Sequence, residues 1–114
     1  MSTPLVRSFF RLARHWPPDD RDYRTRAEWK GSPPSELPAH MKRPWFGWSA
    51  FDSESAARAQ GRRTSGAGQH IARYDLPVGG TITWEKTFGP GHWTLYGAVV
   101  DLSAALVDDY HAMV

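Results

Sequence analysis

The second half of the chain consists of short alternating runs joined by glycine-rich turns. The runs are "QHIARYDLP", "TITWEKTF" and "HWTLYGAVV", and the turns between them are "VGG" and "GPG". Alternation of apolar and polar residues has the period of a half-buried strand. Because parallel neighbours need a crossover of about a dozen residues or more, turns this short predict an antiparallel meander.

The first half of the chain predicts helices around an aromatic strand. Residues 45–51, "WFGWSAF", predict a strand, and the helix that follows it has Asp52 or Ser53 as its N-cap. Residues 17–31 predict an earlier helix, and residues 101–114 predict a short helix with room for a last strand. These elements together predict a compact α+β domain of mostly antiparallel sheets with two to three helices.

Residues 4–16 leave two structures open. A helix would place Leu5, Phe9, Leu12 and Trp16 on one apolar face. A strand over residues 8–15 would place Phe10 and Leu12 on the same face. The periodicity favours the helix, whereas the order of the following elements favours the strand. The Pro-Pro pair that follows ends either element, because a proline has no backbone N–H to donate.

Proline dominates the segment before the aromatic strand. Residues 31–44 hold four prolines in fourteen positions, so they predict a surface loop, placed where it can cover a site. The chain has 114 residues, which is the length of one domain, and we expect residues 1–114 to form it.

The composition excludes several kinds of site. The chain has no cysteine, which excludes disulfides, thiolate nucleophiles and cysteine-based zinc sites. The five histidines show neither HExxH nor HxH spacing, so we expect no metal. No run approaches 18 apolar residues, so we expect no membrane span and no membrane partner. We expect a cytoplasmic protein, because the arginine-rich start has no apolar signal core and no small-residue cleavage site.

Charge is distributed unevenly along the chain. Residues 1–63 hold 12 of the 14 lysines and arginines against 7 of the 12 acidic residues. Residues 64–114 hold two basic and five acidic residues. A basic half attracts phosphates, either of a dinucleotide or of a nucleic acid. The structural alternative is a solvated face with ordinary ion pairs.

Glu85 and His92 are the candidate catalytic residues. Glu85 shares a strand face with Thr81 and Thr83 in "TITWEKT". A carboxylate there would stabilise the oxocarbenium-like charge that develops as a glycosidic bond breaks, and its structural alternative is a solvated cross-strand partner. His92 follows "FGPG", which lets the backbone pass close to a ligand, so His92 would hydrogen-bond a ribose or polarise a substrate group. Its structural alternative is a surface residue on a tight hairpin.

Three residues of the first half are candidate contacts for a dinucleotide. The planar guanidinium of Arg11 suits the paired oxygens of a pyrophosphate, and Trp48 would stack on a ring such as nicotinamide. Ser49 follows Trp48 in the same strand and is a candidate to line the same pocket. The structural alternatives are an exposed amphipathic face for Arg11 and core packing for Trp48. Because neighbouring residues on a strand alternate, Trp48 and Ser49 point to opposite faces unless the strand is bent there.

Three sequence motifs of common enzyme classes are absent. The chain contains neither of the glycine-rich phosphate-binding patterns GxxxxGK[ST] and GxGxxG, nor the nucleophile elbow GxSxG. Asp52 and Glu54 at the start of the predicted helix would also repel a phosphate there.

The order of these elements resembles small ADP-ribosyltransferase-like domains, including compact toxin-type members of bacteria. The resemblance covers residues 8–100 and is carried by "FFRLAR", "WSAFDSESAARAQ", "IARYDLP", "TITWEKT" and "GHWTLYG". In that family an early strand supplies Arg or His for the dinucleotide, and a middle strand leading into a helix supplies Ser or Tyr beside the nicotinamide ribose. A late strand supplies a polar catalytic residue, often Glu. By position these roles fall to Arg11, to Ser49, and to Glu85 or His92.

The resemblance implies an NAD-consuming ADP-ribosyltransferase, a toxin or modifier in a bacterial conflict system. NAD would be its substrate and a macromolecule its acceptor. The charge and aromatic content support an alternative of a different class, a small basic module that binds nucleic acid or a partner protein without catalysis. Stabilisation by NAD favours the enzyme, whereas salt-sensitive binding of oligonucleotides favours the module.

Overall fold

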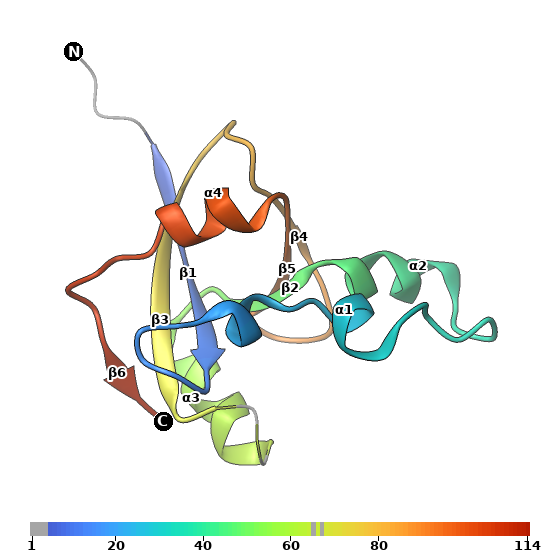
Figure 1. Cartoon of the computed structure of the whole chain (residues 1–114), viewed down its shortest axis with the longest axis horizontal. Coiled ribbons are helices and arrows are strands. Elements are labelled where there is room, and N and C mark those ends of the chain that lie inside the picture. The colour runs from blue at the N-terminus through green and yellow to red at the C-terminus, as the bar shows by residue number, and fades with distance from the viewer. Residues whose placement is uncertain (1–4, 65, 67) are drawn as a thin grey trace.

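The computed structural model describes residues 5–64, 66 and 68–114, so parts of the predicted domain at residues 1–4, 65 and 67 lie outside the described residues. The described chain forms one six-stranded sheet in the order β4-β5-β2-β1-β3-β6, with every pair antiparallel (Figure 1). The strands are β1 (Val6–Ala13), β2 (Trp48–Phe51), β3 (His70–Pro77), β4 (Thr83–Lys86), β5 (His92–Tyr96) and β6 (Ala112–Met113).

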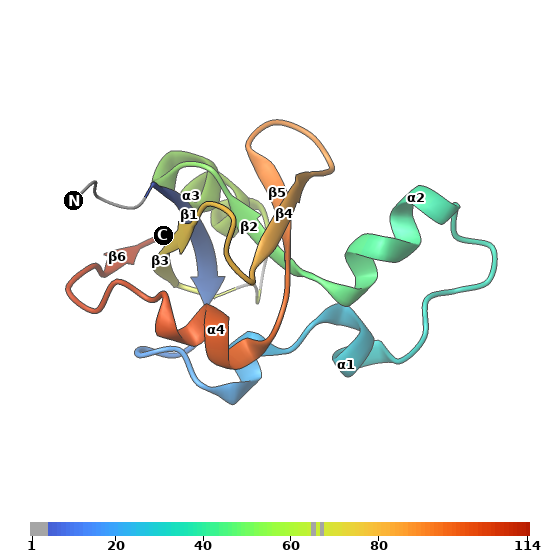
Figure 2. The same cartoon turned by 90° about the horizontal axis from the view of Figure 1, so that it is seen from above.

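Helices cover both faces of this sheet. The α-helices of the described chain are α1 (Arg26–Lys30), α2 (Ala39–Lys42), α3 (Glu54–Arg63) and α4 (Val99–Ala104). Two 3-10 helices accompany them, η1 (Asp20–Tyr23) and η2 (Arg43–Phe46). Helices α3 and α4 lie on opposite sides of β1 and β3 (Figure 2). The predicted antiparallel α+β domain is therefore confirmed, with one sheet and four described α-helices instead of several sheets and two to three helices.

The strand alternative for residues 4–16 is confirmed. Strand β1 pairs with β3 along its whole length, from Val6 opposite Pro77 to Ala13 opposite His70. Within β1, Phe9 is fully buried on one face, and the other face carries half-buried apolar residues. Because both faces carry apolar residues, the segment also matches a helical period, which was misleading.

The single helix predicted over residues 17–31 is wrong, because two short helices form there. Asp19 and Thr25 each cap a helix start, and each makes a capping box with the residue three positions later. Since a capping box begins a new helix, the second box ends the first helix after one turn.

Three predicted strands are shorter than expected, and β4 covers only Thr83–Lys86 of "TITWEKTF". The run at residues 45–51 enters the sheet only at Trp48, because Arg43–Phe46 form η2. Strand β5 ends at Tyr96, since α4 starts at Val99. Residues 31–44, predicted as a surface loop, contain the short helix α2.

Two apolar clusters hold the sheet between its helices. On the α4 side the cluster contains Phe9, Trp48, Ala50, Ala72, Tyr74, Leu76, Leu95 and Leu102. On the α3 side it contains Phe51, Ala57 and Ile71. The cap of α3 is Ser53, one of the two predicted alternatives, and its side chain accepts from the N–H of Ala56. No described helix has the length and apolar composition that a bilayer crossing requires.

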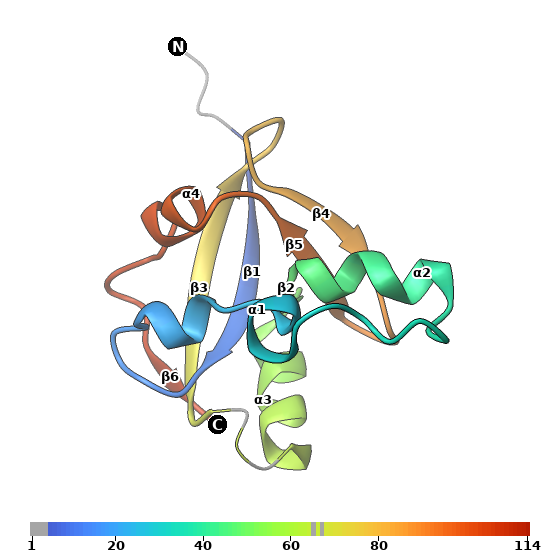
Figure 3. The same cartoon turned by 45° about the vertical axis from the view of Figure 1, so that its right-hand side comes forward.

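One segment projects away from the sheet. We define the arm as residues 24–46, which include α1, α2 and η2 and extend to one side of the domain (Figure 3). The indole N–H of Trp45 donates to the carbonyl of Gly31 at 2.7 Å, which ties the end of the arm to the C-terminal end of α1.

Candidate active site

Ser49 and His92 meet on one face of the sheet. Strands β2 and β5 pair so that Phe51 lies opposite His92 and Ser49 lies opposite Thr94. Cross-strand partners in an antiparallel pair share a face. The Oγ of Ser49 lies 2.5 Å from Nε2 of His92. Ser49 is exposed and His92 is half-buried, so the pair is open to a ligand from solvent.

Thr87 orients the ring of His92 from the other side. The Nδ1 atom of His92 lies 2.8 Å from Oγ1 and 3.3 Å from the carbonyl oxygen of Thr87. Since a carbonyl only accepts, this contact places the proton on Nδ1 and leaves Nε2 to accept from the Ser49 hydroxyl. A hydroxyl, a base and a third orienting group in this order form the arrangement that activates a nucleophile.

Burial keeps His92 neutral. The imidazole lies between two phenyl rings, with centroids 5.3 Å away for Phe51 and 5.5 Å away for Phe88. Burial lowers the pKa of His92 below its usual value. The hydrogen bond to the Thr87 carbonyl opposes this effect, and the nearby Lys86 charge reinforces it. A neutral imidazole at neutral pH is the form that accepts a proton from a hydroxyl.

Phe88 occupies a strained position in the β4–β5 turn. Its φ angle is +42°, in the left-handed region that bulky residues rarely adopt. Such a conformation costs on the order of 1–3 kcal/mol and persists where the surrounding structure requires it. The ring is 55% exposed while it contacts His92. An exposed aromatic ring beside the Ser49–His92 pair offers a stacking surface to a planar ligand.

Glu85 lies on the same face, two strands away from Ser49. Glu85 pairs with Thr94, and Thr94 pairs with Ser49, so the three residues form a row across β4, β5 and β2. With neighbouring strands about 4.8 Å apart, the Cα atoms of Glu85 and Ser49 are separated by about 10 Å. The hydroxyl of Tyr96 donates to the Glu85 carboxylate. Burial and this hydrogen bond raise the pKa of Tyr96, which keeps its hydroxyl protonated as a donor.

Arg43 brings a positive charge to the Glu85 carboxylate. Its Nη1 lies 3.8 Å from Oε2 of Glu85, and its guanidinium carbon lies 4.9 Å from the ring centre of Tyr96. The side chain of Arg43 is 69% exposed. The guanidinium therefore remains accessible to an anionic ligand while it contacts Glu85.

Arg11 and Trp48 lie on the opposite face from Ser49. Arg11 is 8% exposed, and its guanidinium donates to the carbonyls of Ser49 at 2.9 Å and Asp22 at 3.1 Å. Trp48 is 4% exposed, and its indole donates to the carbonyl of Tyr23 at 2.7 Å. The alternation of Trp48 and Ser49 predicted from the strand is confirmed. Both buried side chains hold the β2 backbone in place.

Arg43, Thr87, Phe88 and Tyr96 were not singled out from the sequence. For Thr87 and Phe88 a signal was present, because a four-residue turn "FGPG" would pair Thr87 with His92. That pairing occurs, with the Thr87 N–H donating to the His92 carbonyl at 3.1 Å. Arg43 had no signal, because it reaches the sheet from the arm.

Other features of the described chain lie away from this face. His15, Asp19 and Asp22 offer metal-ligand atoms within 4.8 Å of one another, but the Asp22 carboxylate already accepts from the backbone N–H groups of Arg14 and Asp19.

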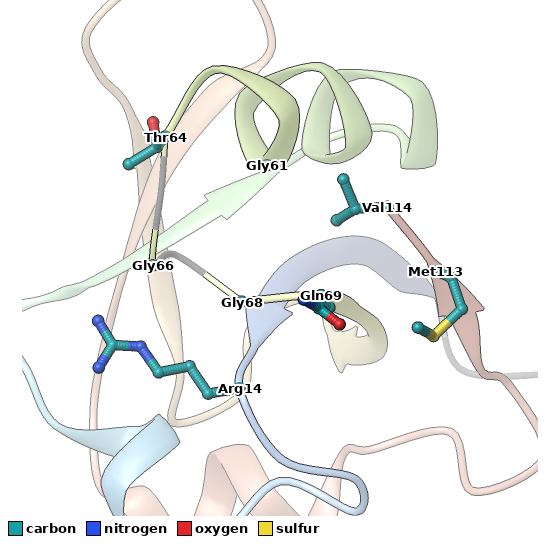
Figure 4. A pocket seen from close by; sticks show the side chains of 8 residues that line it. All are labelled: Arg14, Gly61, Thr64, Gly66, Gly68, Gln69, Met113 and Val114. Carbon is teal, nitrogen blue, oxygen red and sulfur yellow. The ribbon is translucent and has the colours of Figure 1, made fainter.

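Two cavities of the described chain lie elsewhere, and Ser49, Glu85 and His92 line neither of them. One, of about 850 Å³, is lined by Arg14, Gly61, Thr64, Gly66, Gly68, Gln69, Met113 and Val114 (Figure 4). The other, of about 450 Å³, is lined by Asp20, Tyr23, Arg24, Thr25, Glu28, Phe46, Trp48, Gly97 and Val99.

Comparison of the chain with protein-family models, with curated proteins and with solved structures found no match.

Proposed function

We propose that this chain is an NAD-consuming ADP-ribosyltransferase and that the face shared by Ser49, Glu85 and His92 is its active site. One observation carries the proposal. These residues come from three separate segments, each with a role assigned from its position in the sequence, and they lie on one accessible face of adjacent strands.

Each of the three residues has a distinct task in this reaction. The bond between C1′ of the ribose and the nicotinamide nitrogen breaks, and its electron pair leaves with neutral nicotinamide. The Glu85 carboxylate stabilises the positive charge that develops on the ribose. An acceptor hydroxyl or amine, or water in its absence, bonds to C1′ as nicotinamide leaves, and its proton passes to Nε2 of His92. Ser49 hydrogen-bonds a ribose hydroxyl and holds the sugar between the two catalytic groups.

Residues around this face supply the remaining contacts for NAD. Phe88 stacks on the nicotinamide or adenine ring, since its exposed ring borders His92. Arg43 binds the pyrophosphate, because its accessible guanidinium suits paired oxygens. In this proposal Arg11 and Trp48 are positioning residues, since both are buried against backbone carbonyls beneath the site.

Nicotinamide release from NAD by the purified full chain tests the proposal. Glu85→Gln keeps the shape of the side chain and removes its charge, so we expect the rate to fall about 100-fold or more. Glu36→Gln is the matched control, because Glu36 is an exposed carboxylate in the arm with no contact to this face. We also expect NAD to raise the melting temperature. An unchanged rate for Glu85→Gln overturns the assignment of Glu85.

The hydrogen-bonded series Ser49–His92–Thr87 favours a second candidate, a hydrolase with Ser49 as nucleophile. The Ser49 oxygen would attack an acyl carbon, and His92 would take its proton and pass it to the leaving group. Glu85 has no part in that chemistry. Hydrolysis of p-nitrophenyl acetate that survives Glu85→Gln but not Ser49→Ala would establish the hydrolase in place of the transferase.

A further inference from the structure

We propose that the arm, residues 24–46, binds single-stranded nucleic acid and presents it to the Ser49–Glu85–His92 face. The binding of nucleic acid stands on the arm alone. Its role as the acceptor of ADP-ribose rests on the proposed function.

The arm carries an excess of positive charge. It holds five arginines and lysines against two glutamates. Among the described residues, the ion pairs include Arg43 but none of Arg24, Arg26, Lys30 or Lys42. Because the arm projects from the domain, its charged side chains can contact a partner that does not contact the sheet (Figure 1). A polyanion is the partner that this charge attracts.

Aromatic rings are interleaved with these charges. Trp29 is 51% exposed, and the guanidinium carbons of Arg14 and Arg24 lie 5.3 Å and 5.8 Å from its ring centre. Arg26 lies 5.4 Å from the ring centre of Trp45. A base stacked on Trp29 would place its own phosphates beside the guanidinium groups. Proteins that bind single strands combine a positively charged path with aromatic stacking platforms in this way.

The positive charge and the exposed aromatic rings of the arm together favour single-stranded nucleic acid over other polyanions. A duplex satisfies the charge but keeps its base faces stacked against each other, so it has no ring to offer Trp29. An acidic peptide satisfies the charge but lacks the flat rings that stack on an indole. An unpaired nucleotide chain supplies both the phosphate charge and the exposed bases.

The end of the arm reaches the candidate active site. Arg43 belongs to η2 and lies 3.8 Å from the Glu85 carboxylate. A nucleic-acid strand bound along the arm would therefore extend to Glu85 and His92. There a hydroxyl or ring nitrogen of the nucleic acid bonds to C1′ of the ribose as nicotinamide leaves, and the displaced proton passes to His92.

Fluorescence anisotropy with labelled oligo(dT) and oligo(U), measured with the full chain between 50 and 200 mM salt, tests the binding. We expect Trp29→Ala to raise Kd about 5- to 150-fold, the range for loss of one stacked base, and Trp29→Phe to keep most of the affinity. We expect Arg24→Ala/Arg26→Ala to reduce the slope of log K against log salt by about 0.7 per lost phosphate contact. The matched control is Arg62→Ala/Arg63→Ala, which removes two exposed arginines of α3 and should leave the slope unchanged.

Three outcomes overturn the proposal: unchanged oligonucleotide affinity in Trp29→Ala, an equal loss of slope in the α3 control, or binding of oligoglutamate by the wild type as tight as its binding of the oligonucleotides. Nicotinamide release separates this proposal from the enzymatic one. No nicotinamide release by the wild type together with Trp29-dependent oligonucleotide binding removes the transferase and leaves the nucleic-acid surface. Glu85-dependent nicotinamide release without oligonucleotide binding supports the transferase and overturns the nucleic-acid surface.

Discussion

The hydroxyl oxygen of Ser49 lies 2.5 Å from Nε2 of His92, although 43 positions separate the two residues in the chain. Ser49 faces solvent, whereas its backbone carbonyl on the other side of the strand accepts from the buried Arg11. Ser49 thus links the exposed face of the sheet to the interior. The position of its hydroxyl depends on how firmly that interior holds the strand.

We expect His92→Gln to lower nicotinamide release from NAD about 100-fold or more, because the variant removes the group that accepts the proton. Thr87→Val should have a smaller effect, since the Thr87 carbonyl still orients Nδ1. His40→Gln changes an exposed histidine of the arm and is the control. A fully active His92→Gln variant would show that the proton goes elsewhere.

The pKa of His92 should lie below its usual value near 6.5 in an NMR titration, because burial disfavours the charged ring. Replacement of its exposed neighbour in Phe88→Ala admits water and should move this pKa back toward the usual value. An unchanged pKa in Phe88→Ala would mean that Phe88 contributes nothing to the desolvation.

The same shift makes the stability of the fold pH-dependent. At pH values between the lowered folded-state pKa and the usual pKa, His92 is mostly protonated in the unfolded chain and mostly neutral in the folded chain. The free energy of unfolding should therefore fall as pH drops below about 6.5 and level off below the folded-state pKa. Urea unfolding at several pH values measures this slope, and His92→Gln should lose the part that His92 contributes.

Arg11→Met should destabilise the fold by about 2 to 4 kcal/mol, since it leaves the carbonyls of Ser49 and Asp22 without their donors. Urea unfolding measures the change, and Arg62→Met on the exposed end of α3 should stay within about 0.5 kcal/mol of wild type. If Arg11→Met unfolds like wild type but no longer binds NAD, Arg11 contacts the dinucleotide instead of the scaffold.

Gly47→Ala should destabilise the protein by about 1 to 3 kcal/mol through overpacking. A Cβ atom at this position would lie 2.4 Å from Cγ2 of Thr94, 2.7 Å from the Leu95 carbonyl oxygen and 2.8 Å from Cε1 of Tyr96. Its relaxation would move η2, and with it Arg43, away from Glu85. Thermal unfolding checks the stability, with Ser32→Ala in the exposed loop as the control. A wild-type melting temperature would show that η2 shifts without cost.

Two local features followed from local signals in the sequence. The Ser53 cap of α3 and the opposite faces of Trp48 and Ser49 are confirmed, because a cap and an alternation depend only on neighbouring residues. The β1 segment had a misleading helical period, and its pairing with β3 resolved the choice. The candidate site was predicted in part, since Glu85, His92 and Ser49 share a face while Arg11 does not share it.

The sequence by itself determined an antiparallel α+β domain, because its turns are too short for parallel crossovers and its alternation has the period of a strand. Only the tertiary structure decided that β2 lies between β5 and β1. That neighbourhood brings Ser49 to His92 and buries Arg11 beneath it. The physical reason is that strand order depends on which apolar faces bury each other, and this is a property of the whole chain rather than of any one segment.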